Sequence, residues 1–256
     1  MCYWNNLYPE VSKMKGNNKT KVVEETGQKY NEIIFEEDYI PKDIYIHQIK
    51  LRNDIINQSL QNKKFEYIVD LGCGTGFHLK TLSKYATNLI ACDMSFGALK
   101  ESKKHLKCEY IVCDINRLPF KPNTIDLIWI AGVLHHVPDD LENVIGNNIS
   151  PALKKNGILL VDEPNKFNLF NFVNMKLSKA DPTGDERPLS LYSVKKLLIT
   201  NNFKVVNSSP YELFSPFGAL LNNKSVLKLT TFFDNLLSKT PLKLILLRWH
   251  ILAEKK

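Results

Sequence analysis

A glycine-rich turn is the segment of this sequence whose residue types and spacing most clearly favour ligand binding. Residues 70–76 are DLGCGTG, with a glycine at every second position from 72 to 76. Glycines at these positions let the backbone turn tightly and approach a ligand without an intervening Cβ. The helix that we expect after the turn would direct its N-terminal N–H groups and positive dipole end at the same place. The predicted binding residues of the turn are Asp70, Gly72, Cys73, Gly74 and Gly76.

Acidic residues end the next two predicted strands. A dinucleotide-binding turn would need its third glycine at position 77, and the Phe at that position disfavours a nicotinamide cofactor. Asp93 lies about 20 residues after the first glycine, where a carboxylate can accept hydrogen bonds from ribose hydroxyls. Asp114 ends the third strand at a similar depth. Together with Asp70, these carboxylates suit a ligand that carries ribose hydroxyls, an amine and a sulfonium charge.

Two histidines, a glutamate and an arginine are candidates for chemistry at the same place. His135 and His136 follow the fourth predicted strand, and an imidazole there can act as a base near neutral pH. We favour His136 over His135 as the catalytic residue. Glu163, after the fifth strand, and Arg187, in the segment that follows, are candidate substrate-binding residues, with a surface ion pair as the alternative for each. No His, Asp and Glu residues have convincing metal-ligand spacing, so no metal is expected.

An alternation of strands and helices positions these residues. The predicted strands cover residues 67–71, 88–93, 109–114, 125–130, 158–162, 203–206 and 250–253, and the predicted helices cover residues 77–85, 96–105, 138–155 and 192–201. Continuous apolar strands that alternate with helices indicate a parallel sheet covered on both faces. Ligands of such sheets bind at the carboxyl ends of the strands, which is where the acidic residues lie. The fold class is therefore α/β.

Segments outside this alternation divide the chain. Residues 1–26 are polar and predict a flexible N-terminal arm, and residues 27–62 predict a helical cap of two helices that break at Pro41. The main domain then covers residues 63–256. It contains two long insertions, 164–190 and 211–248, which we expect to be lids over a pocket because short connections would otherwise suffice.

The sequence resembles the class I S-adenosylmethionine-dependent methyltransferases, in particular the type 11-like group that acts on small molecules. The motifs that carry the resemblance are DLGCGTG (70–76), Asp93, CDINRLPF (113–120), IDLIWIAGVLHHVPD (125–139) and LKKNGILLVDEPN (153–165). They cover about residues 65–165 firmly and 190–206 loosely. The resemblance implies a doubly wound, mostly parallel, seven-stranded sheet. None of its motifs covers the N-terminal helices or residues 211–248, which we expect as helical lid segments from their position outside the alternation.

The resemblance also implies S-adenosylmethionine as the cofactor and a role for each motif residue. The glycine turn would face the methionine end of the cofactor, and Asp93 with Met94 would hold the ribose. Asp114 would bind the adenine amino group, and the backbone of Ile115 would contact the ring. Ala131 would lie beside the sulfonium.

The composition favours some locations and partners of the protein over others. The five cysteines form no CxxC pair and no basic, apolar leader begins the sequence, so we expect a cytoplasmic protein with reduced thiols. The net charge of +7 lies in residues 190–256, which hold ten basic and three acidic residues. Apolar residues from Val226 to Leu237, among lysines, predict an amphipathic helix. It would cover a lipid-like substrate or make peripheral contact with an anionic membrane, or else be a lid helix packed on the sheet with its lysine face in solvent. DNA is not an expected partner and RNA is not favoured.

The expected reaction is methyl transfer to a small molecule, to oxygen before nitrogen or carbon. Sugars, quinones and lipid-linked metabolites all remain open as acceptors. One alternative is a tRNA- or rRNA-modifying methyltransferase, because the LPF and HH motifs also occur in some wobble-uridine enzymes. Another alternative is a non-catalytic binding protein that keeps the cofactor fold.

Overall fold

A single mixed sheet organises the part of the chain that the computed structural model describes, residues 42–169, 171 and 186–256. Its strands are β1 (Phe65–Leu71), β2 (Ala86–Asp93), β3 (Glu109–Val112), β4 (Ile125–Ala131), β5 (Leu153–Pro164), β6 (Phe203–Tyr211) and β7 (Arg248–Lys255). Among the described residues these seven strands have the order β3-β2-β1-β4-β5-β7-β6. Neighbouring strands are parallel except β7, which is antiparallel to both β5 and β6. This arrangement confirms the predicted doubly wound, mostly parallel sheet.

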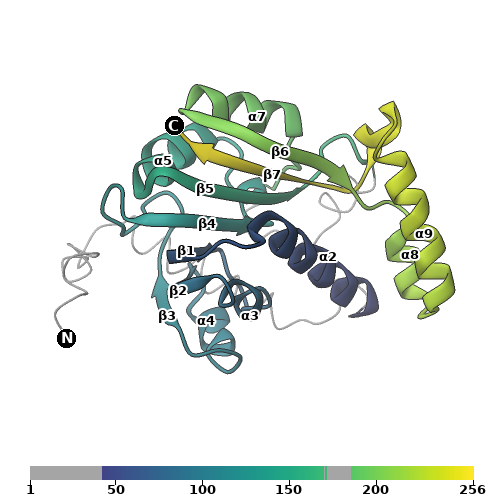
Figure 1. The fold of residues 1–256 in the computed structure, drawn as a ribbon, viewed down its shortest axis with the longest axis horizontal. Helices are drawn as coiled ribbons and strands as arrows, with labels where there is room; N and C mark the ends of the chain where they lie inside the picture. The colour runs from purple at the N-terminus through teal and green to yellow at the C-terminus, as the bar shows by residue number, and fades with distance from the viewer. Residues whose placement is uncertain (1–41, 170, 172–185) are drawn as a thin grey trace.

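Helices cover both faces of the sheet (Figure 1). They are α2 (Lys42–Leu60), α3 (Leu79–Leu82), α4 (Phe96–Ser102), α5 (Ser150–Ala152), α7 (Leu191–Thr200), α8 (Ser215–Leu220) and α9 (Lys224–Leu237), with the short helices η3 (Leu134–His136), η4 (Asn143–Ile149) and η5 (Pro241–Ile245). Apolar side chains of α2, α3 and α4 pack on one face, and those of η4 and α7 pack on the other. None of the described helices is long and apolar enough to cross a membrane.

Strand β4 shows why the sheet is buried on both sides. Leu127 and Trp129 belong to the core on the α2 face, whereas Ile128 and Ile130 belong to the core on the α7 face, and all are fully buried. Side chains alternate between the two faces of a strand, so a strand covered on both faces must be apolar throughout. The continuous apolar runs of the sequence reflect this packing.

The order of the strands places the carboxyl ends of β1 and β4 next to each other. Strand β1 lies between β2 and β4. The connection after β1 leads to β2 on one side, and the chain later returns to β4 on the other side of β1, so the connections diverge between β1 and β4. Such a switch point leaves a crevice at the carboxyl edge, the usual ligand site of open α/β sheets. The loop after β4 lies close to the glycine turn, because a Cβ on Gly72 would be 2.2 Å from Cγ2 of Val133.

Several predicted element boundaries are wrong. The helix expected over residues 138–155 is instead η4 followed by α5, and β5 begins at Leu153. Leu153 pairs with Ile125 of β4, so pairing in the sheet overrides the local helical pattern. Strands β6 and β7 are longer than predicted because they pair with each other along their length. The helix after the glycine turn is the single short turn α3.

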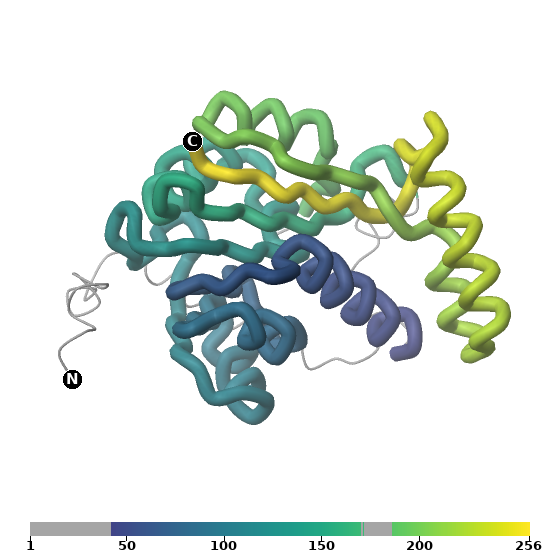
Figure 2. The backbone as a smooth tube through the Cα atoms, in the orientation of Figure 1, coloured from purple at the N-terminus to yellow at the C-terminus, as the bar shows by residue number. Residues whose placement is uncertain are grey.

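The structure describes the predicted cap and lids only in part. The arm (1–26) and the first part of the cap fall outside the described residues, and α2 is the described part of the cap. The insertion at 164–190 is described only at 164–169, 171 and 186–190. The insertion at 211–248 contains α8, α9 and η5. Helix α8 contacts both α9 and α2, and the pair α8–α9 stands at the carboxyl edge of the parallel strands (Figure 2).

Candidate functional site

The glycine turn is tied to the end of β2 by backbone hydrogen bonds. The N–H groups of Gly72 and Cys73 donate to the Cys92 carbonyl at 2.8 and 2.9 Å, respectively. Gly72, Gly74 and Gly76 all have positive φ values, between 52° and 87°, which side chains with a Cβ disfavour. The turn is therefore a fixed backbone structure that only glycine adopts without strain.

Asp93 joins the glycine turn to the start of α4. Its Oδ2 accepts the Gly74 N–H at 2.8 Å and its Oδ1 accepts the Ser95 N–H at 2.8 Å. A Cβ built on Gly74 would have no atom within 4 Å, so the turn faces open space at this residue. A carboxylate oxygen can accept more than one hydrogen bond, so Asp93 can also accept hydrogen bonds from a ligand. The structure thus brings a carboxylate and an uncovered glycine together, as the sequence predicted.

Asp70 lies in the sheet beneath this turn. Its side chain is buried, and its Oδ2 has no hydrogen-bond partner. Burial, and then the nearby charge of Asp93, raises the pKa of Asp70 to about 8. Asp70 therefore holds its proton more tightly than an exposed aspartate, mainly because it is buried and partly because Asp93 lies nearby.

The other predicted cofactor residues lie at the neighbouring strand ends. Asp114 follows β3, and its Oδ1 accepts the Asn116 N–H at 2.9 Å, which closes a local turn. Ile115 is buried against the core on the α7 face. Met94 is half-buried directly after β2, and Ala131 is half-buried as the last residue of β4. All four therefore lie at the carboxyl edge that the sequence predicted.

Glu163 holds the loop after β4 and has no surface left for a substrate. It is fully buried, and its Oε1 accepts the N–H groups of Val133 and Leu134 at 2.8 and 2.7 Å. Its Oε2 lies 2.7 Å from Nδ1 of His135, which is itself buried. Burial raises the pKa of Glu163, but the His135 ring and these hydrogen bonds outweigh burial and hold it below its ordinary value. The structure replaces the predicted substrate contact of Glu163 with a positioning role.

His136 is the more exposed of the two imidazoles. Its Nδ1 is 2.7 Å from Oε1 of Glu186, and its side chain is 26% exposed. Burial raises the pKa of Asp93 and the electrostatic effect of His136 acts against it, so the two side chains lie near each other. These positions support the choice of His136 over the buried His135 as the base.

Arg187 forms the surface ion pair that the sequence left as its alternative. Its Nη1 is 3.4 Å from Oδ1 of Asp139, and both side chains are largely exposed. Its backbone N–H donates to the His135 carbonyl at 3.1 Å. The backbone of Arg187 thus helps to place Glu186 beside His136, whereas its side chain points to solvent.

His135, His136 and Glu186 also form a group that could hold a metal ion. Their candidate ligand atoms lie within 4.8 Å of one another. Each imidazole already has a carboxylate partner at 2.7 Å, so two histidine–carboxylate pairs account for the group without an ion. The expected absence of a metal stays a prediction.

A buried charged cluster at the same edge was missed by the sequence analysis. Oδ1 of Asp162 accepts from Nε of Arg52 at 3.0 Å and from Nε and Nη2 of Arg248 at 2.9 and 2.6 Å. The hydroxyl of Tyr211 donates to its Oδ2. Burial alone raises the pKa of Asp162, but the two guanidinium groups and Tyr211 bring it below its ordinary value. This cluster fastens α2 to the ends of β5, β6 and β7.

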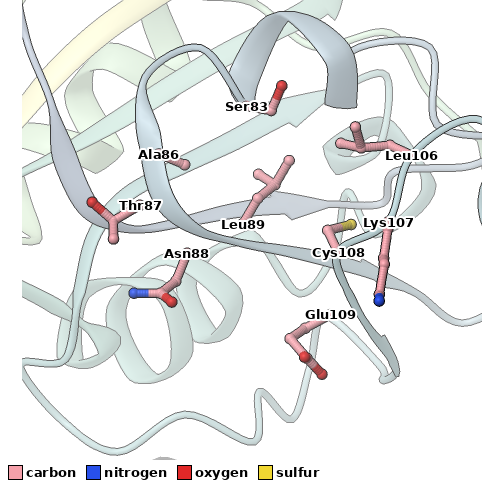
Figure 3. Close-up of a pocket in the computed structure, with 9 residues that line it drawn as sticks. All are labelled: Ser83, Ala86, Thr87, Asn88, Leu89, Leu106, Lys107, Cys108 and Glu109. Atoms are coloured by element: carbon pink, nitrogen blue, oxygen red, sulfur yellow. The ribbon is translucent and has the colours of Figure 1, made fainter.

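A cavity of about 320 Å³ lies at the opposite edge of the sheet. Figure 3 shows its lining, which comes from the end of α3, the first half of β2 and the segment before β3. Ala86 and Glu109 are the first residues of β2 and β3, whereas the glycine turn lies at the other ends of the strands. This cavity is therefore separate from the site formed by Gly74, Asp93 and His136.

A comparison with known protein families matches the segment that contains this carboxyl edge. Residues 69–161 match the family model described as a methyltransferase domain, and the match spans the glycine turn, Asp93, Asp114 and both histidines. Residues 69–161 are a methyltransferase domain. The predicted resemblance to class I methyltransferases is confirmed by this match and by the fold. S-adenosylmethionine is the cofactor of these methyltransferases, so the predicted cofactor is confirmed with the domain.

Relatives and solved structures place the domain in wider context. A human probable tRNA methyltransferase 9B is 42% identical over 82 residues, which is 32% of this chain and 17% of that protein. The uncharacterized protein MJ0638 of Methanocaldococcus jannaschii is 35% identical over 135 residues, 50% of this chain and 57% of that protein. A SAM-dependent methyltransferase from Archaeoglobus fulgidus has the same fold, with a TM-score of 0.62 at 17% identity over 86% of this chain and 98% of that one. The chain thus spans less than two thirds of the curated relatives that it matches.

Proposed function

We propose that the whole protein transfers a methyl group from S-adenosylmethionine to an oxygen atom of a small-molecule acceptor. The observation that carries the proposal is the pairing of Asp93 with Gly74 beside open space, with His136 nearby. These residues come from the turn after β1, the end of β2 and the loop after β4. They meet at the switch point of the sheet, where ligands of this architecture bind.

The residues at this edge fit the cofactor. The open space at Gly74 accommodates a ligand next to the backbone, and Asp93 beside it is a carboxylate that can accept hydrogen bonds from ribose hydroxyls. The buried Asp70 has an oxygen without a hydrogen-bond partner, which a donor group of the ligand would satisfy. When bound, the cofactor supplies a methyl group that an acceptor atom can attack in line. The protein has to align the acceptor and remove its proton.

His136 and Glu186 are the pair that can perform the proton transfer. The carboxylate of Glu186, 2.7 Å from Nδ1, orients the ring. His136 would therefore accept a hydroxyl proton through its other nitrogen. Glu163 fixes the loop from which His136 extends by binding the N–H groups of Val133 and Leu134.

Calorimetry of cofactor binding tests the site. Gly74→Val should abolish binding, because the branched side chain fills the open space and the residue has positive φ. Asp93→Ala should weaken binding by about 1–3 kcal/mol through the loss of a charged hydrogen-bond acceptor. Asp126→Ala is the matched control, because Asp126 also accepts a backbone N–H, that of Tyr67 at 2.8 Å, but lies at the other end of its strand.

The same measurements separate the proposal from a non-catalytic binding protein. Incubation with methyl-labelled cofactor and fractionated metabolites should transfer label to a small molecule in the wild-type protein and not in Gly74→Val. Unchanged cofactor affinity in both site variants would refute the assignment of the site. Cofactor binding without any labelled product would favour the non-catalytic alternative.

Modification of tRNA is the second candidate function. The observation that favours it is the 42% identity to a probable tRNA methyltransferase 9B over 82 residues. An RNA substrate would be held through its phosphates, so its affinity should fall steeply as the salt concentration rises. Label found in the tRNA fraction, with that salt dependence, would support this candidate over a small-molecule acceptor.

A further inference from the structure

The helical hairpin at the carboxyl edge exposes large apolar side chains. We call residues 214–245, which contain α8, α9 and η5, the apolar hairpin. Its apolar side chains that are more than half exposed include Phe217, Leu221, Leu229, Phe232, Leu236 and Leu242. Exposed apolar patches of this kind mark surfaces that bind a protein, a membrane or a ligand.

Helix α9 has two apolar faces, and only one of them packs on the part of the protein that the structure describes. A Cβ on Gly218 of α8 would be 2.9 Å from Cα of Leu227 and 2.3 Å from Oγ1 of Thr230, so α8 and α9 are in close contact on that face. Leu229, Phe232 and Leu236 follow the spacing of a helical stripe and are 55%, 60% and 53% exposed. The sequence predicted one apolar face from Val226 to Leu237, and the structure divides it into an inner and an outer one.

The exposed charges of the apolar hairpin are basic. Its lysines, Lys224, Lys228, Lys239 and Lys243, are all exposed. Its acidic residue, Asp234, is buried and accepts the N–H groups of Phe214 and Ser215 at 2.8 and 2.9 Å. The outer surface therefore combines an apolar stripe with positive charge.

We propose that the apolar hairpin docks the protein onto an anionic phospholipid bilayer. The outer stripe would enter the boundary between headgroups and acyl chains, and the lysines would extend to the phosphate groups beside it. Each lysine near an anionic surface adds attraction that salt screens. The basic charge favours a bilayer over a neutral apolar partner, because such a partner would leave the lysine charges without a complement.

The position of the hairpin connects docking to the site. Helix α8 contacts α2, and both helices lie at the carboxyl edge that holds the glycine turn (Figure 1). A bilayer at this edge brings amphiphilic acceptors close to the proposed site. That consequence rests on the proposed methyl transfer, whereas docking itself does not.

Vesicle flotation of the full chain tests the proposal. The protein should float with vesicles of phosphatidylcholine and phosphatidylserine, and much less with phosphatidylcholine alone. Leu229→Ser/Phe232→Ser should lower the affinity for the anionic vesicles about tenfold or more, because it removes two anchors. Lys228→Glu/Lys239→Glu should lower the affinity for these vesicles by a similar factor, about tenfold or more. The binding that remains should no longer depend on the salt concentration.

Matched variants on the body of the protein serve as controls. Phe96→Ser/Tyr192→Ser removes apolar side chains that are 64% and 75% exposed on α4 and α7. Lys100→Glu/Lys196→Glu reverses exposed charges on the same two helices. Both controls should float like the wild-type protein. Cofactor affinity, measured by calorimetry, should be unchanged in all four variants, so failure of docking and failure of the cofactor site are distinguishable.

Three outcomes would overturn the proposal. One is recovery of the wild-type protein in the unbound fraction with both kinds of vesicle. The second is flotation that the hairpin variants and the body controls affect equally. The third is a wild-type dimer in light scattering that Leu229→Ser/Phe232→Ser converts to a monomer, because a second copy of the chain would then cover the stripe.

Discussion

Two adjacent histidines with different surroundings illustrate how single residues acquire roles in this protein. The rings of His135 and His136 are 4.2 Å apart, yet each contacts a different carboxylate. Burial, and then the charge of His136, lowers the pKa of His135, which keeps the buried ring neutral beside Glu163. His136 is partly exposed next to Glu186. One ring is therefore structural, and the other is the proposed base.

Replacement of His136 should separate catalysis from cofactor binding. We expect His136→Asn to reduce labelled methyl transfer by about 10²–10⁴-fold, the usual effect of losing a general base, with calorimetric cofactor affinity unchanged. Glu186→Gln should reduce transfer less and shift the pH–rate profile, because it acts through the ring. His105→Asn, at an exposed residue after α4, is the control. A rate of methyl transfer by His136→Asn that equals the wild-type rate would contradict the assignment of His136 as the base.

At the scale of elements, the hairpin of α8 and α9 is held by a carboxylate that crosses between helices. Asp234 of α9 satisfies the N–H groups of Phe214 and Ser215, which begin α8 and have no acceptor within their own helix. A short helix such as α8 gains little from its own hydrogen bonds, so it depends on such contacts. The side chain of Asp234 therefore fixes the angle at which α8 meets α9.

Removal of this carboxylate should loosen α8. Asp234→Ala leaves two backbone N–H groups without a partner and should lower the free energy of unfolding by about 1–3 kcal/mol. Asp234→Asn keeps one acceptor oxygen and should lower it less. Urea unfolding measures the loss, and hydrogen exchange should show reduced protection at residues 217–221 before the sheet is affected. Equal protection in the wild type and Asp234→Ala would argue against this role.

At the scale of the whole molecule, stability depends on charges buried where α2, β6 and β7 meet. Oε1 of Glu212 lacks a hydrogen-bond partner, and its Oε2 is 3.5 Å from Nε2 of Gln48. Burial raises the pKa of Glu212 from 4.5 to about 7, although Arg248 and Arg52 act against this. The folded protein therefore binds this proton more tightly than the unfolded chain. Its contribution to the free energy of unfolding is present below pH 4.5 and is lost as the pH rises to about 7.

Glu212→Gln should remove this pH dependence, because glutamine resembles the protonated acid and does not ionise. Above pH 7 the variant should be more stable than the wild type by about 1–3 kcal/mol, and the difference should vanish near pH 4.5. Urea unfolding at a series of pH values measures it, with the exposed Glu109→Gln as the control. A difference that stays constant from pH 4.5 to pH 8 would show that Glu212 does not titrate in this way.

The sequence by itself determined the features that depend on residues close together along the chain. The apolar runs predicted the parallel strands, and the spacing of the glycines predicted the turn at 70–76. Asp93 was also predictable, because a carboxylate at the end of the second strand must lie at the same edge as the turn after the first. The doubly wound sheet and the cofactor site follow from such local patterns.

Only the tertiary structure decided which distant residues meet. Glu186 contacts His136 from a segment 50 positions away, and Arg52 and Arg248 bind Asp162 across 110 and 86 positions. The start of β5 at Leu153 depends on its pairing with Ile125, which overrides a local helical pattern. The exposure of Phe232 and the burial of Asp234 depend on the side of α9 that faces α8. Periodicity records how a segment folds, but contacts between segments depend on packing in three dimensions, which local spacing does not contain.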